Sequence, residues 1–400
     1  IISAAVSQPC SQRPQASELV TAPGQFGVKG VQAERHWPPL TLEEAGRVLG
    51  RFALASAPDT LLWHGQRPFS ATALVKLADG TVLFLKRHDP RLRDYAALME
   101  EHAFMAHLTA QGLPVQVPVK DRAGRSVTEE NGWTYEIFRP LPGLDLYRDV
   151  QSWEPFFCAE QAHTAGRALG RLHLASKEYE APARPNDRLL LSSFKAIAQP
   201  DLEAGLAQWG HSQPGLNALF QSSSWEPDLK VLLPFHDRLK PLLSHIEPLW
   251  GHGDWHPSNQ FWTSSDPTAE ICGIFDFGMS DRTCAAYDLA VAIERTAITW
   301  LAPNYTVAWD QLTALLAGYQ SIRPLSSTER KLVVAFLPLV HVEFALSEVS
   351  YYRTLVHDEA SATVAYSDYL LGHAHWFAGP NGQTLLHWLE ATLEQTASCP

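Results

Sequence analysis

The sequence predicts an α+β protein of two lobes, with a small antiparallel β-sheet in the first lobe and a larger, mainly helical second lobe. Its 400 residues, 46% of them hydrophobic, are enough to bury a sizeable core and to divide into two lobes. Short β-prone segments separated by turn residues gather before residue 140. Helical periodicity dominates the later part of the chain.

The first lobe is placed at residues 39–140, after an extension at residues 1–38 that is rich in Ser, Gln, Ala, Gly and Pro and is expected to be flexible. Thr41 precedes a helical pattern and predicts a capped helix from residue 41 to residue 49. Two apolar, β-prone runs flank the turn signal Asp79-Gly80, which predicts a hairpin with Lys86 near its end. A helix is predicted over residues 95–108.

Residues 133–138 predict a strand that runs into a proline-stiffened connector, after which the second lobe is placed at residues 141–400. Residues 162–175 have helical spacing, and the glycines at 166 and 170 would allow another helix to pack closely. From residue 325 the pattern is again helical, with predicted breaks at Pro338, Gly372 and Gly379-Pro380.

Two motifs in the second lobe carry the chemistry: HGDWHPSN at residues 252–259 and IFDFG at residues 274–278. Phosphoryl transfer from ATP needs a carboxylate that orients or accepts a hydroxyl proton, here Asp254, and metal ligands such as Asn259 and Asp276. Turn-forming residues 264–268 lie between two apolar runs and predict a hairpin that returns Asp276 towards Asn259 and Asp254. The alternative is that these polar groups only cap a turn and end a strand.

Protein kinases combine HRDxxxxN with DFG. The form found here, HGDxHxxN followed by DFG, resembles the aminoglycoside phosphotransferase superfamily, which includes choline kinases and type II homoserine kinases. The resemblance covers residues 39–290 and implies a protein-kinase-like fold with two lobes. It also implies ATP and Mg²⁺ as cofactors and the hydroxyl of a small molecule as phosphate acceptor.

The resemblance extends to the nucleotide site. Lys86, at the end of its strand, would anchor the phosphates, and Glu101, on the next helix, would pair with it. Both are ordinary surface charges in the alternative reading. The phosphate-covering loop falls at residues 63–72 and lacks the usual glycines, so Ser70, Thr72 and backbone amides are its candidate contacts.

The connector between the lobes resembles the family's adenine-binding linker, which predicts a contact window over residues 136–141 that includes Glu136, Ile137 and Phe138. In the family, the helical C-terminal region shapes the acceptor pocket. Its carboxylates and aromatic rings would suit a cationic acceptor, although solvated and packed helix faces explain them equally. These residues are Trp300, Glu343, Glu348, Tyr351, Tyr352, Asp358 and Glu359.

Four further polar residues near the motifs have predicted roles. Magnesium bound to ATP prefers oxygen ligands, so neither His252 nor His256 is needed on the metal. The resemblance implies that His252 braces its loop. His256 is a candidate to face the transferred phosphate. His173 is expected to be a core residue, and Asp288 to cap a helix or orient the active-site loop.

Composition excludes several other classes. A net charge of −12 argues against broad nucleic-acid binding, which needs a basic surface. No apolar run approaches the ~20 residues of a membrane span, and no secretory signal is visible. The five cysteines are odd in number and form no CxxC pair, which predicts free thiols and a cytoplasmic location. The oligomeric state is left open.

The sequence therefore predicts an ATP-dependent phosphotransferase that acts on a hydroxyl of an antibiotic, an amino alcohol, homoserine or a sugar. Two alternatives remain. One is a protein Ser/Thr kinase, although no Arg-rich activation segment lies between Asp276 and Asp288. The other is a nucleotide-binding pseudoenzyme without turnover.

Overall fold

The computed structural model describes residues 36–65, 69–221, 225–302 and 304–395. The chain divides into two compact units. The small unit comprises Gln32–Gly143 together with Cys272–Gly278, a segment that the sequence-based boundaries placed in the second lobe. The large unit contains Leu144–Ile271 and the chain from Met279 onwards. Of the predicted extension at residues 1–38, all but the last three residues lie outside the described part.

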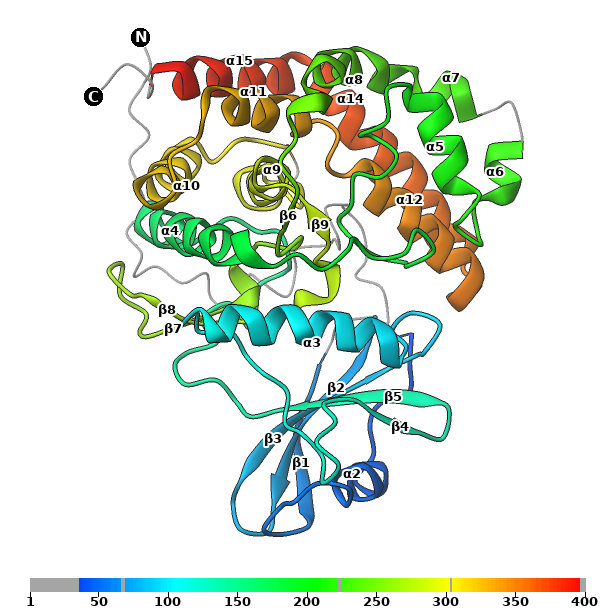
Figure 1. The fold of residues 1–400 in the computed structure, drawn as a ribbon, viewed down its shortest axis with the longest axis vertical. Helices are drawn as coiled ribbons and strands as arrows, with labels where there is room; N and C mark the ends of the chain where they lie inside the picture. The colour runs from blue at the N-terminus through cyan, green and yellow to red at the C-terminus, as the bar shows by residue number, and fades with distance from the viewer. Residues whose placement is uncertain (1–35, 66–68, 222–224, 303, 396–400) are drawn as a thin grey trace. The chain divides into compact units, whose positions relative to one another are not determined.

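The small unit is built on an antiparallel sheet of five strands, in the order β1-β2-β3-β5-β4 (Figure 1). The predicted β-prone runs lie in β2, β3 and β5. Between β2 and β3 the chain turns at Gly80, whose φ is +86°, and Asp79 Oδ1 accepts a hydrogen bond from the Thr81 amide at 2.9 Å. The strands are β1 Pro58–His64, β2 Ala71–Leu77, β3 Val82–His88, β4 Thr128–Glu130 and β5 Trp133–Phe138.

Two helices accompany this sheet. In α2 (Leu42–Leu49), Thr41 and Glu44 form a capping box, which satisfies backbone groups at the helix start. Its buried residues Ala45 and Val48 join the inward-facing residues of the strands in one apolar core. The second helix, α3 (Tyr95–Ala110), is capped by Asp94 and matches the predicted helix over residues 95–108.

The segment that carries Asp276 is anchored to the small unit by backbone pairing. The Ile274 amide donates to the Pro114 carbonyl at 2.8 Å, and the Gln116 amide donates to the Ile274 carbonyl at 3.0 Å. Ile274 ends β8 (Ile271–Ile274). Asp276 therefore follows directly from a strand that is fixed beside the loop after α3.

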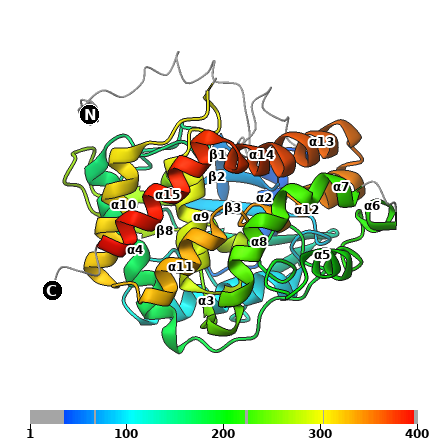
Figure 2. The same ribbon diagram turned by 90° about the horizontal axis from the view of Figure 1, so that it is seen from above.

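The large unit is mainly helical. Its central helix, α9 (Ala285–Ala297), is buried along its whole length, with α10 and α11 beside it (Figures 1 and 2). The other helices are α4 Ala159–Ala175, α5 Leu202–Gly210, α6 Asn217–Gln221, α7 Trp225–Leu229, α8 Leu233–Leu239, α10 Trp309–Ile322, α11 Ser327–Phe336, α12 Val342–Tyr351, α13 Glu359–Val364, α14 Gly372–Ala378 and α15 Pro380–Gln395.

The predicted helix breaks are confirmed at two positions and wrong at one. Pro338 follows the end of α11, and Gly379-Pro380 separates α14 from α15. At Gly372, by contrast, the π-helical segment Ala365–Leu371 continues directly into α14, because glycine is tolerated inside a helix that tertiary packing holds.

Helices α4 and α10 pack side by side, as both views show, and glycines make the close approach possible. A Cβ atom added at Gly166 would lie 2.1 Å from the Leu315 carbonyl oxygen, and one added at Gly318 would lie 2.0 Å from the His163 carbonyl oxygen. Neither distance is sterically possible. The close helix packing that the glycines of residues 162–175 predicted is thus confirmed.

Two further predictions have a structural outcome. Cys272 and Cys284 are free thiols, but Cys158 is disulfide-bonded, so the expectation of free thiols throughout is wrong at Cys158. The absence of a CxxC pair cannot exclude a bridge between cysteines far apart in sequence. The remaining two, Cys10 and Cys399, lie outside the described residues. Within the described ranges, none of the helices combines the length and apolar character that a membrane span requires.

The helix contact yields a stability prediction. Gly318→Ala should lower the free energy of unfolding by roughly 1–3 kcal/mol, because the added methyl group forces α4 and α10 apart. Gly46→Ala in α2 is the matched control. Its added Cβ meets no atom within 4 Å, so the same change should raise stability by about 0.5–1 kcal/mol through helix propensity. Chemical denaturation measures both variants, and a neutral Gly318→Ala would contradict the packing argument.

Candidate active site

The loop that carries Asp254 is held in the large unit by a buried carboxylate on α9. Asp288 accepts hydrogen bonds from the amides of His252 and Gly253, both at 2.8 Å, and from His173 Nε2 at 2.9 Å. Cys284, not Asp288, is the N-cap of α9. Of the two roles predicted for Asp288, the structure therefore confirms loop orientation, and His173 is the expected buried core residue.

Gly253 turns the chain so that Asp254 follows the held amides. Its φ is +76°, and a Cβ atom at this position would lie 2.2 Å from the Met279 carbonyl oxygen. His252 accepts a hydrogen bond from the Asp254 amide at Nδ1, at 3.2 Å, and its ring packs edge-on against Trp255. These contacts agree with the predicted bracing role of His252.

Asp254 is 6% exposed and its two carboxylate oxygens have different partners. Asn259 Nδ2 donates to Oδ2 at 3.1 Å, and His256 Nε2 lies 3.3 Å from the same oxygen. Trp153 Nε1 donates to Oδ1 at 3.4 Å. Because Asn259 uses its amide nitrogen here, its side-chain oxygen is the atom suited to a magnesium ion. The predicted contact of His256 with a phosphate stays a prediction.

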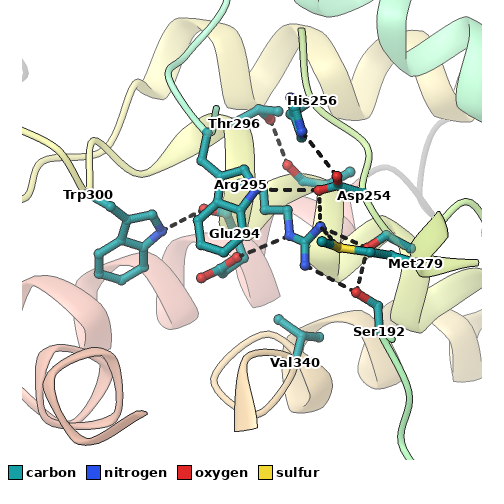
Figure 3. Close-up of polar contacts among 12 residues, drawn as sticks. Ser192, Asp254, His256, Met279, Glu294, Arg295, Thr296, Trp300 and Val340 are labelled. Carbon is teal, nitrogen blue, oxygen red and sulfur yellow. Dashed lines mark hydrogen bonds and ion pairs between the residues drawn. The ribbon is translucent and has the colours of Figure 1, made fainter. Parts of the chain in front are cut away.

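Arg295 is the residue of this site that sequence reasoning missed (Figure 3). It lies on α9, is 2% exposed, and donates through Nη1 to Asp254 Oδ1 and to the Gly253 carbonyl oxygen. Nη2 donates to Ser192 Oγ at 3.1 Å. The guanidinium carbon lies 4.7 Å from the centre of the Trp153 ring. The signal available in the sequence was a basic residue in a mostly apolar helix whose other charged residues, Asp288 and Glu294, are both acidic.

The charges around Asp254 decide its protonation. Burial raises its pKa, but His256, Arg295 and His252 act in the opposite direction and outweigh burial, so the pKa of Asp254 lies well below its usual range. The carboxylate is therefore ionised at neutral pH. Such a group is a weak base, which suits orienting a hydroxyl more than removing its proton early.

In the small unit, Lys86 and Asp276 are neighbours. Lys86 Nζ lies 3.2 Å from Asp276 Oδ1 and 3.7 Å from Glu136 Oε1, since Lys86 and Glu136 face each other across β3 and β5. Burial lowers the pKa of Lys86, but Asp276, Glu136 and Glu101 outweigh it and raise the pKa above its ordinary value. Asp276 has a left-handed backbone, with φ of +61°, and its side chain is 44% exposed.

Glu101 is buried on α3 and pairs with Arg93, whose Nε lies 3.1 Å from Glu101 Oε1. Arg93 also donates through Nη2 to the Gly278 carbonyl oxygen at 2.6 Å. Glu101 therefore connects α3 to the segment that carries Asp276, and its charge also acts on Lys86. The predicted pairing of Glu101 with Lys86 stays a prediction.

Glu136 occupies a position that the adenine-contact prediction did not anticipate, because its side chain points towards Lys86. It is buried and accepts hydrogen bonds from His88 Nε2 at 2.9 Å and His102 Nε2 at 2.8 Å. Burial raises the pKa of Glu136, but both histidines and Lys86 outweigh burial and hold it well below the usual range.

The backbone of Ile137 is used within the sheet, where its carbonyl oxygen accepts from the Val119 amide at 2.7 Å. Phe138 pairs with Phe84 of β3 and ends β5. Contacts of Glu136, Ile137 and Phe138 with adenine stay a prediction. Residues 139–141 are the part of the predicted window that lies outside the strand.

The predicted site residues thus form two groups, each assembled within its own unit. Asp254 and Asn259 belong to the large unit, and Lys86, Glu101, Glu136 and Asp276 belong to the small unit. The predicted turn between the two motifs is confirmed, since the Thr263 amide donates to the Glu270 carbonyl oxygen at 2.9 Å. The convergence of Asp276 on Asn259 and Asp254 stays a prediction.

Comparison with known proteins places these residues in a family. Residues 66–325, more than half of the chain, match the model of the phosphotransferase enzyme family. The chain belongs to this family. It is similar to a homoserine kinase of Methylobacterium radiotolerans, with 30% identity over 59% of this chain and 62% of the relative. A homoserine kinase of Acidiphilium cryptum is 28% identical over 67% of this chain and 72% of the relative. The chain thus spans about three fifths of the first relative's length.

Solved structures of other phosphotransferases share the fold. An amicoumacin kinase matches with a TM-score of 0.56 and 15% identity, over 82% of this chain and 91% of that chain. An aminoglycoside phosphotransferase of Alicyclobacillus acidocaldarius matches with a TM-score of 0.51 and 15% identity, over 90% and 98%. These likenesses confirm the predicted α+β, two-lobed, protein-kinase-like fold.

The Glu136 cluster yields a pH-dependent stability prediction. Glu136→Gln should lower the free energy of unfolding by roughly 1–3 kcal/mol at neutral pH, because it removes the charge that the histidines and Lys86 surround. The pKa of Glu136 is depressed in the folded state, so this stabilisation is complete above its ordinary value of 4.5 and is lost as the pH falls through the folded value.

Denaturation of wild type and variant at a series of pH values from about 7 down to about 2 tests this, because the difference should persist above the ordinary pKa of 4.5 and shrink as the pH falls below it. Glu129→Gln, an exposed carboxylate on the neighbouring strand β4, is the matched control and should leave stability unchanged. A difference that stays constant with pH would show that the Glu136 charge is not the stabilising element.

Proposed function

We propose that this protein transfers the γ-phosphate of ATP to a hydroxyl group of a small molecule. The observation that carries the proposal is the buried, ionised Asp254, whose carboxylate is oriented by Asn259 and Arg295 in a loop held by Asp288. The Lys86–Asp276 pair of the small unit supports it, because these residue types bind nucleotide phosphates and their metal.

Asp254 would orient the acceptor hydroxyl by accepting its hydrogen bond. Phosphoryl transfer passes through a loose transition state, in which the attacking oxygen needs little negative charge until late. A carboxylate with a depressed pKa is therefore adequate, because the hydroxyl proton need move only as the new P–O bond completes. Asp254 would therefore contribute mainly by positioning the acceptor hydroxyl for attack on the γ-phosphate.

Asn259 and Asp276 would hold Mg²⁺. Both offer side-chain oxygens, the ligand type that this ion prefers, and it commonly binds through one or two protein oxygens together with phosphates and water. When bound, the metal neutralises the charge on the nucleotide phosphates. The amicoumacin kinase named above was solved with AMP-PNP and Ca²⁺, which supports a nucleotide and a divalent cation in this fold.

The homoserine kinase relatives support an acceptor with a primary hydroxyl, such as homoserine or a related amino alcohol, and the aminoglycoside phosphotransferase fold keeps antibiotics and sugars among the candidates. None of the relatives and structures named above is a protein kinase. A cytoplasmic location remains part of this proposal and rests on the need for ATP, because the free-thiol argument fails at Cys158.

The decisive experiment measures ATP consumption by the purified protein with Mg²⁺ across amino alcohols, sugars and aminoglycosides. One alcohol should be phosphorylated, and Asp254→Asn should lower its kcat by about 10²- to 10⁴-fold while ATP binding persists. Asp187→Asn, at an exposed position, serves as control and should be fully active. Wild-type protein that binds ATP but phosphorylates nothing would favour the pseudoenzyme, and an active Asp254→Asn would exclude Asp254 as the hydroxyl-orienting group.

Arg295 should also affect the reaction. Arg295→Met removes a charged donor from Asp254 and should lower kcat by about 10- to 100-fold with little change in the KM for ATP. Arg295→Lys should recover part of the loss, because it restores the charge without the planar geometry. Arg171→Met, at an exposed position of α4, should behave like wild type. Equal losses in the Lys and Met variants would indicate that the charge itself contributes nothing.

A further inference from the structure

Glu348 on α12 is a buried carboxylate of the large unit with an unsatisfied oxygen atom. It is 2% exposed, and its Oε1 atom is buried without a hydrogen-bond partner. Each of the other buried carboxylates in the described ranges accepts at least one hydrogen bond or forms an ion pair. These are Glu44, Asp89, Glu101, Asp121, Glu136, Asp254, Asp281, Asp288, Glu294 and Glu343. Such an exception needs a specific explanation.

The contrast is sharpest within α12 itself. Glu343, little more than one turn earlier, accepts bonds from Ser193 Oγ and from the amides of Lys195, Ala196 and Ile197. Its carboxylate is fully used to hold a loop, as expected of a structural residue. Glu343 thus has hydrogen-bond donors for both carboxylate oxygens, whereas the Oε1 atom of Glu348 has none.

Glu348 is linked to the surroundings of Asp254 through Arg295, whose charge acts on it, and through its neighbour on α12. Phe344 is one turn earlier on the same face. The Phe344 ring lies 6.0 Å from Trp153 and 5.2 Å from the Arg295 guanidinium carbon, and both Trp153 and Arg295 donate to Asp254. Trp153 adopts a left-handed backbone, with φ of +69°, a conformation that is rare for a bulky residue and clusters at functional sites.

Aromatic rings complete the surroundings of Glu348. Tyr369 lies 5.5 Å from Trp153 and 6.2 Å from Phe344, and the charge of Glu348 acts on the phenols of Tyr369 and Tyr352. A carboxylate surrounded by aromatic rings can bind a cation, through ion pairing with the carboxylate and cation–π contact with the rings. Asp254, the residue proposed to contact the acceptor hydroxyl, is nearly as buried as Glu348. The low exposure of Glu348 is therefore no argument against contact with the same ligand.

Among the described residues, no Lys, Arg or His forms an ion pair with Glu348. Arg295 is the cation whose charge acts on it, yet Arg295 is engaged with Asp254, the Gly253 carbonyl and Ser192. Burial raises the pKa of Glu348 well above its ordinary value, as expected of a carboxylate that lacks a partner. A positively charged group on a ligand would provide the missing partner.

We propose that Glu348 is an acceptor-binding residue whose carboxylate receives the ammonium group of an amino alcohol. The inference rests on the proposed function and deepens it: the hydroxyl of the acceptor lies at Asp254 and its amine at Glu348, with the rings of Trp153, Phe344 and Tyr369 around the chain between them. Specificity for an amine over an uncharged alcohol then resides in one side chain.

The test compares matched acceptors that differ only in the amine. L-homoserine is paired with 4-hydroxybutanoate, and 3-amino-1-propanol with 1,3-propanediol, in steady-state assays with ATP and Mg²⁺. Wild type should prefer the amine of each pair. Glu348→Gln should raise the KM for the amine by about 10- to 100-fold, because a charge-assisted contact is lost, and should leave the KM for ATP and the turnover of the uncharged partner unchanged.

Glu203→Gln, an exposed carboxylate on α5, is the matched control and should keep the wild-type preference. Glu348→Asp retains the charge on a shorter side chain and should keep part of it, which preserves the test if the Gln variant folds poorly. A Glu348→Gln variant that still prefers amines, or a wild type that prefers the uncharged alcohols, would overturn the assignment of Glu348. No ATP consumption with any alcohol, these pairs included, would overturn the proposed function and this inference with it.

Discussion

The hydrogen bonds of Asp288 are the interaction on which the large unit's site depends. This carboxylate is fully buried, yet its pKa is lowered, because the bonds and charge of His173 and the held amides outweigh burial. Arg295 stands two turns later on the same helix, so α9 both fixes the loop and contacts the carboxylate of Asp254. A helix buried along its whole length is a rigid support for such a task.

Charge pairing organises the small unit in a comparable way. Lys86 is surrounded by acidic groups, and Glu136 is in turn held by His88 and His102. In the described part of the small unit, each buried charge has a partner of opposite sign or a hydrogen-bonding partner, which makes the burial of these ionisable groups tolerable. The left-handed backbone of Asp276 fits the same pattern, since strained residues persist where surrounding structure holds them.

Local sequence predicted β2, β3 and β5 and the helices α2 and α3, and it singled out the motif around Asp254, because these depend on residues close together in the chain. Arg295 and the partners of Glu136 depend on tertiary contacts between residues far apart, 41 positions for Arg295 and Asp254, and no spacing rule reports them. The same reason explains the disulfide at Cys158. Glu348 was visible in the sequence as one of several carboxylates, but only the structure separates it from Glu343.

The glycine contact between α4 and α10 has a consequence beyond packing. His173 belongs to α4 and bonds through Nδ1 to the hydroxyl of Tyr319, the residue after Gly318, at 2.7 Å. Through Nε2 the same histidine reaches Asp288. The interhelical spacing that the glycines permit therefore sets the alignment of a hydrogen-bonded chain that ends at the loop carrying Asp254. A substitution where α4 meets α10 would therefore shift the loop that carries Asp254 without changing any residue of that loop.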